Sequence, residues 1–358
     1  MNSNNVYHFF MSATTPKGFA SHLCDLTNYN KFDNTLIIKG PAGSGKSTLI
    51  KRAVEKLGMR SCCELIHCSQ DSQSLDGAII NDRAVSLVDA TSPHVVEPTL
   101  AGSKQRVVSL YDFFDSEILK DYEKEIINAY ESEKAYGVRI QSFIRAAGML
   151  LSSNEKLSAR CVNRDKLLSF ATRLCSREIK GKKSGIGEIK IRYLSSVCEN
   201  GILMFTDTVE KMCSKIYKIE DTPSAVAPVL LESVTRAATR AGYDVYVCLC
   251  PLSDSDKIDH VLIPELSLAF MTSNKFHPIK IENARTIHTS RFYDREKLSE
   301  YSIRTSFTRR AAREILKEAG IFMKKKMQCH TRLENYYVQA CDFEERDRYF
   351  DSFIEKID

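Results

Sequence analysis

One stretch of the sequence combines glycines, a lysine and hydroxyl residues at a fixed spacing. Residues 40–48 read GPAGSGKST, which matches the pattern G-x-x-x-x-G-K-[ST]. Glycine allows the backbone to curl until successive N–H groups point at one phosphate, with no Cβ in the way. Lys46 would reach the β- and γ-phosphates of a nucleotide, and the Ser47 hydroxyl would ligate Mg²⁺. The residues expected to form this phosphate-binding loop are Gly40, Pro41, Ala42, Gly43, Ser44, Gly45, Lys46, Ser47 and Thr48.

The segments on either side of this loop fit the same interpretation. The apolar run at residues 36–38 predicts a strand before the loop, and a helical pattern extends from the loop to Val54. A helix that begins near Gly45 would add the positive end of its dipole to the phosphate site. A glycine turn without a ligand is the alternative, but every motif position and both flanking elements argue against it.

A carboxylate further along the chain could complete this site. An apolar strand predicted over residues 84–89 ends in Asp89, which is the expected form of a Walker B element that holds Mg²⁺ through its water shell. Asp76 and His94 are polar residues near predicted strand ends, and are candidates for a general base and a γ-phosphate sensor. Together with Lys46, these three residues are the catalytic candidates.

Two parts of the expected site stay open. Ala90 follows Asp89, at a position where many ATPases carry a water-polarising glutamate, and Glu97 is a further candidate for that role. An arginine finger is not assigned, because rows of arginines on predicted helices are usually solvated or paired with acids. The arginines considered are Arg139, Arg145, Arg304, Arg309, Arg310 and Arg313.

The second half of the chain repeats the first. Residues 259–277 align with residues 76–94 without a gap, and both stretches pass into helical segments. The sequence therefore predicts a tandem duplication of one α/β unit and its helical appendage. In this alignment Thr272 stands where the first copy has Asp89.

The second copy lacks the residues expected to bind phosphate and metal. When Lys39 is aligned with Lys218, residues 219–226 lie over the loop, and its lysine and serine become Ala225 and Val226. The joint loss of these residues and of the Walker B aspartate supports their assignment to one site. We therefore expect one nucleotide per chain and a second copy that acts as a scaffold.

The same comparison limits the roles of Asp76 and His94. The second copy keeps both residue types, as Asp259 and His277, although it has no phosphate-binding loop. A structural role explains this retention at least as well as a catalytic one.

Composition narrows the class of protein. The chain has 358 residues and a net charge of +5, which gives no bulk argument for nucleic-acid binding. Cysteine and histidine at residues 62–68 could suggest a metal site, but their alternation in CCELIHC fits a strand. With no apolar leader and no 18-residue apolar run, we expect a soluble, cytoplasmic protein with reduced cysteines and no membrane association.

The predicted fold class is α/β, with P-loop NTPase-type sandwiches of mainly parallel strands, duplicated in tandem, each followed by a helical segment. The expected boundaries are 1–115 for the active copy, 116–190 for a helical segment and linker, 191–294 for the inactive copy and 295–358 for a C-terminal helical segment.

With these features assembled, the chain resembles a family of uncharacterised bacterial P-loop ATPases built from two tandem repeats. The resemblance implies ATP binding and hydrolysis, and it implies a glycine-rich loop in both halves, from which this chain departs at 219–226. The stretches that carry it are GPAGSGKST (40–48), HCSQDSQSLDGAII (67–80), VSLVDATSPHVVEP (85–98), VLIPELSLAFMTSNKFHP (261–278) and LENYYVQACDFEERDRYFDSFIEKI (333–357).

The sequence thus predicts Mg²⁺-dependent ATP binding and hydrolysis by the N-terminal repeat, driving a conformational change or the interaction with a protein partner. The expectation that the nucleotide is ATP rather than GTP is based on the resemblance and on the lack of a guanine-reading motif. One alternative is a phosphotransferase whose small acceptor binds the polar segment 69–77. The other is a nucleotide-binding regulatory scaffold with negligible turnover.

Overall fold

The computed structural model describes residues 6–58, 61–181 and 183–357, which form two compact units. Unit 1 contains residues 6–12, 21–140 and 320–357, and unit 2 contains residues 13–20 and 141–319. Each unit is built around one six-stranded sheet.

The sheet of unit 1 has the strand order β1-β5-β6-β7-β4-β8. Strand β6 is antiparallel to both of its neighbours, and every other neighbouring pair is parallel. The strands are β1 (Val6–Phe10), β4 (Asn34–Lys39), β5 (Cys63–His67), β6 (Leu75–Ile80), β7 (Val85–Asp89) and β8 (Gln105–Ser109).

The local sequence explains the strand and helix on either side of the glycine-rich loop. The central residues of β4, 36–38, are fully buried, as expected for a strand covered on both faces. Helix α1 (Lys46–Leu57) is amphipathic and begins directly after Gly45, whose φ of 75° is left-handed. The buried residues of α1 form one stripe that joins the apolar core of the sheet: Leu49, Ile50, Ala53, Val54 and Leu57.

The sheet of unit 2 has the order β16-β12-β15-β14-β13-β9, in which β14 is the strand antiparallel to its neighbours. Helix α6 (Ala227–Arg240) follows β12 as α1 follows β4, and a short helix α5 (Thr206–Met212) precedes β12. The strands are β9 (Ile189–Arg192), β12 (Lys215–Glu220), β13 (Val245–Leu249), β14 (Ile258–Ile263), β15 (Leu268–Ser273) and β16 (Arg285–His288).

The two sheets have the same topology, since each strand of unit 1 has a counterpart with the same neighbours in unit 2. A two-stranded hairpin follows the first strand of each copy: β2 (Ser12–Thr15) with β3 (Gly18–Ser21), and β10 (Ser195–Cys198) with β11 (Gly201–Met204). The prediction of a tandem-duplicated α/β protein with mostly parallel sheets is therefore confirmed.

Helical segments follow both sheets, as predicted. The first copy is followed by α2 (Ser116–Asp121), α3 (Glu123–Ala159) and α4 (Arg164–Glu178), and the second by α7 (Arg295–Glu300), α8 (Ser302–Ala340) and α9 (Phe343–Ile354). Short 3₁₀ helices lie at Leu23–Thr27, Asn81–Arg83, Tyr111–Phe113, Pro264–Leu266 and Thr289–Phe292.

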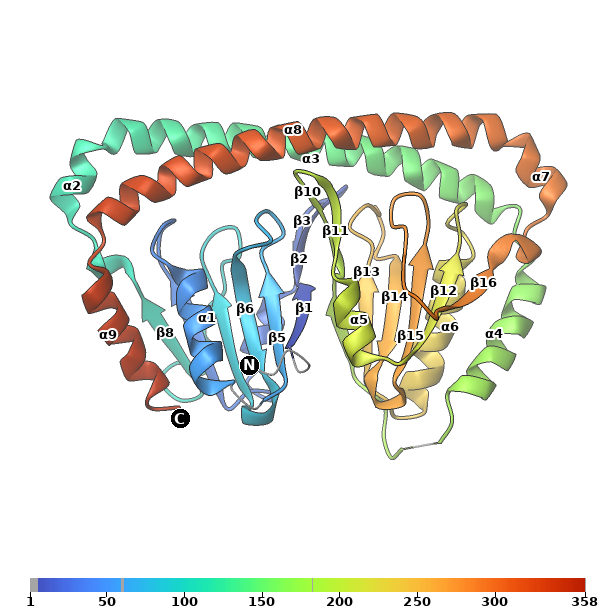
Figure 1. Cartoon of the computed structure of the whole chain (residues 1–358), viewed down its shortest axis with the longest axis horizontal. Coiled ribbons are helices and arrows are strands. Elements are labelled where there is room, and N and C mark those ends of the chain that lie inside the picture. The colour runs from blue at the N-terminus through green and yellow to red at the C-terminus, as the bar shows by residue number, and fades with distance from the viewer. Residues whose placement is uncertain (1–5, 59–60, 182, 358) are drawn as a thin grey trace. The chain divides into compact units, whose positions relative to one another are not determined.

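The last helix of each copy packs in the unit of the other copy. The boundary between the units falls inside α3, after Ile140, and inside α8, after Ala319. Helix α9, drawn in red beside α1 in Figure 1, thus belongs to unit 1, where Phe350 and Ile354 enter the core of the first sheet. Helix α4 contacts α6 in unit 2. Each unit therefore includes the last helix of the other copy.

Among the described residues, no helix has the length and apolar character that crossing a membrane would require.

Candidate functional site

The glycine-rich loop connects the end of β4 to the start of α1 in unit 1. Gly43 and Gly45 have φ angles of 72° and 75°, in the left-handed region that favours glycine. A Cβ on Gly43 would lie 2.6 Å from the carbonyl oxygen of Glu334 in α8, and one on Gly45 would overlap the guanidinium of Arg346 in α9. The glycines are thus required both by the curl of the loop and by the helices packed behind it.

Lys46 lies at the first position of α1 with its amine turned back into the loop. Its Nζ donates to the carbonyl oxygens of Gly40 and Pro41, each at 2.9 Å, and lies 3.7 Å from Oδ2 of Asp89. The side chain is only 12% exposed. The amine is therefore held inside the loop by two backbone carbonyls, which an anion could replace as its partners.

Asp89 reaches this site because β7 lies directly beside β4, with Asp89 paired with Ile38 in parallel register. Burial raises the pKa of Asp89, and the positive charge of Lys46 opposes that effect. Its Oδ1 accepts a hydrogen bond from the backbone N–H of Thr91 at 3.0 Å, which fixes the carboxylate at the strand end.

The Ser47 hydroxyl lies one residue further along α1. Its oxygen accepts a hydrogen bond from the backbone N–H of Leu75 at 2.9 Å and keeps a second lone pair for another interaction. The first turn of α1 and the carboxyl ends of β4 and β7 therefore bring Lys46, Ser47 and Asp89 to one edge of the sheet. Thr48 follows them in the same turn and is exposed.

Asp76 and His94 form a buried pair in unit 1, with His94 Nε2 and Asp76 Oδ2 3.2 Å apart. Asp76 also accepts a hydrogen bond from Ser12 at 3.4 Å. In unit 2 the corresponding Asp259 and His277 are likewise buried, with 3.7 Å between Oδ2 and Nδ1. Because the pair recurs beside both loops, the structural interpretation gains support, while a catalytic role for Asp76 and His94 stays a prediction.

The other candidates from the sequence have partners away from the loop interior. Glu97 forms an exposed ion pair with Lys39. In unit 1 the Arg139 guanidinium lies 5.5 Å from the centroid of the Phe322 ring. Arg145 and Arg313 belong to unit 2, with contacts to the Pro16 carbonyl and the Phe276 ring, and Arg304, Arg309 and Arg310 belong to the same unit.

One arginine that sequence reasoning did not single out contacts the loop directly. Arg346 on α9 donates from Nη1 to the carbonyl oxygen of Ser44 at 2.9 Å and is only 5% exposed. A signal for it exists in the sequence, because Arg346 occupies the apolar stripe of α9 between Phe343 and Phe350. A charged residue on a stripe that faces the core needs a specific partner.

The structure corrects the alignment of the second loop with the first. Strand pairing matches Asn34 with Val85 in unit 1 and Lys215 with Leu268 in unit 2. Since α1 begins at Lys46 and α6 at Ala227, the lysine is replaced by Ala227 rather than Ala225.

The serine is correspondingly replaced by Pro228 rather than Val226. The alignment by sequence was wrong by two residues because it matched Lys39 with Lys218. The register of β4 with β7 and of β12 with β15 makes Glu220 the residue equivalent to Lys39. The loss of the lysine and of the hydroxyl in the second copy is unaffected by this shift.

The second loop carries an anion of its own. Asp221 stands at the position of Gly40, is fully buried, and accepts hydrogen bonds at Oδ2 from the N–H groups of Val226 and Ala227, both at 2.8 Å. Its Oδ1 accepts from the Tyr293 hydroxyl at 2.7 Å. Burial and this carboxylate raise the pKa of Tyr293, so that the phenol stays protonated and donates. The amides at the start of α6 therefore already bind a carboxylate.

Among the described residues, no group of three or more His, Cys, Asp and Glu side chains is placed to hold a metal ion. Ser47 and Asp89 supply two oxygen donors, which suits Mg²⁺ because this ion usually keeps several waters and binds substrate phosphates. The donor set fits Mg²⁺ bound together with a nucleotide.

Comparison with protein-family models, curated proteins and solved structures gives no match to this chain. The fold and the tandem duplication define it as a two-unit α/β protein, and its function must be argued from the chemistry of the site.

Proposed function

We propose that unit 1 binds ATP with Mg²⁺ and hydrolyses it, using the loop between β4 and α1. The observation that carries this proposal is the position of the Lys46 amine, which lies inside a loop with two left-handed glycines and 3.7 Å from Asp89. The Lys46 amine inside the loop, the Ser47 hydroxyl and the Asp89 carboxylate match the needs of a Mg²⁺-bound triphosphate.

The residues of the loop would act mainly by positioning and by neutralising charge. The N–H groups of residues 42–47 would bind phosphate oxygens, with the dipole of α1 adding positive potential. Lys46 would exchange its bonds to the loop carbonyls for bonds to the β- and γ-phosphates. Ser47 and Asp89 would hold the Mg²⁺, which supplies further neutralisation of the phosphate charge.

A phosphotransferase is the second candidate function, and the partners of two possible bases favour it. Glu97 is paired with Lys39, and both ring nitrogens of His94 have partners, Nε2 at Asp76 and Nδ1 at Ser21, so that neither residue is free to activate water in this arrangement. A hydroxyl acceptor bound near residues 69–77 would then take the phosphoryl group in place of water. A regulatory scaffold that binds ATP with negligible turnover remains the third alternative.

Calorimetric titration of the full chain with ATP, in the presence and absence of Mg²⁺, tests the proposal. We expect one site per chain, Mg²⁺-dependent affinity, and release of phosphate without any added acceptor. ADP formation that requires a mixture of small hydroxyl compounds would favour the phosphotransferase. Binding without turnover under either condition would favour the scaffold, and a lack of affinity for ATP or GTP would overturn all three.

A further inference from the structure

Arg346 is a buried cation that lies behind the phosphate-binding loop of unit 1. Its Nη1 donates to the carbonyl oxygen of Ser44 at 2.9 Å, and its guanidinium lies 4.6 Å from the centroid of the Phe343 ring on the same helix. The guanidinium also fills the space that a Cβ on Gly45 would occupy. The loop and the arginine therefore fit each other at the peptide between Ser44 and Gly45.

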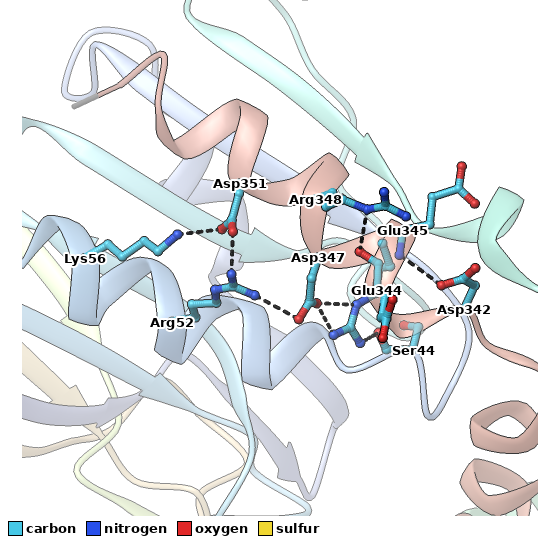
Figure 2. Close-up of polar contacts among 10 residues, drawn as sticks. Ser44, Arg52, Lys56, Asp342, Glu344, Glu345, Asp347, Arg348 and Asp351 are labelled. Carbon is cyan, nitrogen blue, oxygen red and sulfur yellow. Dashed lines mark hydrogen bonds and ion pairs between the residues drawn. The ribbon is translucent and has the colours of Figure 1, made fainter.

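Arg346 is held in this position by a network of ion pairs between α9 and α1. Its Nε donates to Oδ1 of Asp347 at 2.9 Å, and the other carboxylate oxygen of Asp347 accepts from Arg52 at 2.8 Å. Asp351 on the next turn pairs with Arg52 and with Lys56. Figure 2 shows these acidic residues of α9 facing the basic residues of α1, with Ser44 at the end of the network.

Because a peptide bond is rigid, the contact of Arg346 with the Ser44 carbonyl also constrains the direction of the Gly45 N–H. The bond between Ser44 and Gly45 is planar and trans, so that its carbonyl and its N–H point in opposite directions. When Arg346 fixes the Ser44 carbonyl toward α9, the Gly45 N–H is directed toward the interior of the loop. The bond is charge-assisted, which makes it stronger than one between neutral groups.

The second copy provides an internal comparison for this residue. Helix α4 is the counterpart of α9, and the side chains of their N-cap residues, Asn163 and Asp342, each accept a hydrogen bond from a backbone N–H three residues later. Four residues after the cap, α4 has the fully buried Leu167 where α9 has Arg346. The arginine thus accompanies the loop that has a lysine and is replaced by an apolar residue where that lysine is lost.

We infer that Arg346 is a positioning residue that directs the Gly45 N–H at a bound phosphate. The conformation of the loop at residues 44–45 therefore depends on the packing of α9 against it. This inference rests on the proposed nucleotide site. Because the Gly45 N–H would contact phosphate in the ground state and in the transition state alike, losing its orientation weakens binding more than it slows the chemical step.

The test compares Arg346→Ala with Arg348→Ala, a change to an exposed arginine two residues away whose Nε contacts the Glu344 carbonyl on the same helix. For Arg346→Ala we expect the Kd for Mg-ATP and the KM to rise about ten- to a hundredfold, with kcat within about threefold. Arg348→Ala should leave both constants within about twofold, and Arg346→Lys should recover part of the affinity because it keeps the positive charge.

An unchanged Kd in Arg346→Ala, with wild-type protein binding normally, would overturn the role of Arg346 alone. A loss of kcat in proportion to unfolded protein, with KM unchanged, would also overturn it. If Arg346→Ala does not fold, Arg346→Lys decides, because a KM at least about threefold higher supports the inference and an unchanged KM contradicts it. Absence of binding by both wild type and Arg348→Ala would instead reject the nucleotide site itself.

Discussion

The two loops that follow β4 and β12 share part of their backbone conformation but carry side chains of opposite charge. Gly43 and Ser224 occupy equivalent positions and have similar left-handed φ angles, 72° and 65°. In unit 1 the loop contains Lys46, and in unit 2 the corresponding helix start binds the carboxylate of Asp221. The loops diverge two residues later, where Gly45 is left-handed with a φ of 75° and the equivalent Val226 has a φ of −91°.

A physical requirement explains why the second loop contains a buried carboxylate. The first N–H groups of a helix have no partner inside the helix, and leaving them buried without one is costly. Asp221 satisfies those of Val226 and Ala227 at the positive end of the α6 dipole. In unit 2 the acceptor for these N–H groups comes from the same chain. In unit 1 we propose that a ligand supplies it.

The largest expected effect comes from removing the lysine that distinguishes the first loop. Lys46→Ala should lower kcat/KM for ATP hydrolysis about a thousandfold, because a charged donor at the transferring phosphoryl group is lost. Steady-state phosphate release measures this. Lys51→Ala, on the same helix with its amine on the Gln73 carbonyl, should stay close to wild type. Equal activity of the two variants would show that Lys46 is not part of the catalytic site.

The second prediction concerns the carboxylate that distinguishes the other loop. Asp221→Ala should lower the free energy of unfolding by about 3 kcal/mol, since it leaves two backbone N–H groups and the Tyr293 hydroxyl buried without an acceptor. Denaturant titration gives the value, with Glu232→Ala, at an exposed position of α6, as a control within about 0.5 kcal/mol. A loss no larger than that of the control would refute the account of the second loop.

The third prediction uses the acid–histidine pair that the two copies share. If the pair is structural, Asp76→Asn and Asp259→Asn should each lower the free energy of unfolding by about 2 kcal/mol. The kcat of the folded Asp76→Asn protein should then stay near that of wild type. A large loss of kcat in Asp76→Asn, with the same stability loss as Asp259→Asn, would show instead that Asp76 acts in catalysis.

The smallest expected effect is on pH dependence beside the first loop. Hydrogen bonds to Glu133 and Glu334 raise the pKa of His330 on α8 to about 9. A raised folded-state pKa means that the protonated histidine stabilises the fold fully below its ordinary value of 6.5, and that this contribution is lost as pH rises toward 9. Thermal unfolding of wild type and His330→Gln should therefore differ most at low pH and converge at high pH.

A wild-type advantage over His330→Gln that persists undiminished above pH 9 would contradict the assignment.

Local sequence patterns were sufficient for much of the fold. The apolar run of β4, the glycine spacing and the amphipathic α1 predicted the strand, loop and helix that the structure has. The gapless repeat predicted the shared topology, because β6 and β7 correspond to β14 and β15 in both order and length of connection. Such signals depend on neighbouring residues and can be detected without knowledge of distant contacts.

Other features depended on contacts between distant segments. The antiparallel orientation of β6 and the pairing of β1 with β5 are decided by hydrogen bonds across the sheet. The correct alignment of the second loop required the strand register, because matching lysines in the sequence placed it two residues away. Register depends on which residues the whole strand buries and on the turns that join it to its neighbours, so one matched lysine does not define it.

The sequence by itself determined the α/β duplication and the residue types available to a phosphate site in the first copy. Only the tertiary structure decided that α9 of one copy covers the loop of the other, with Arg346 on the Ser44 carbonyl, and that Asp221 occupies the second loop. The reason is that glycine spacing and apolar periodicity are local properties of the chain. The partner of a buried charge is selected by packing among elements that can lie three hundred residues apart, as Arg346 and Ser44 do at a separation of 302.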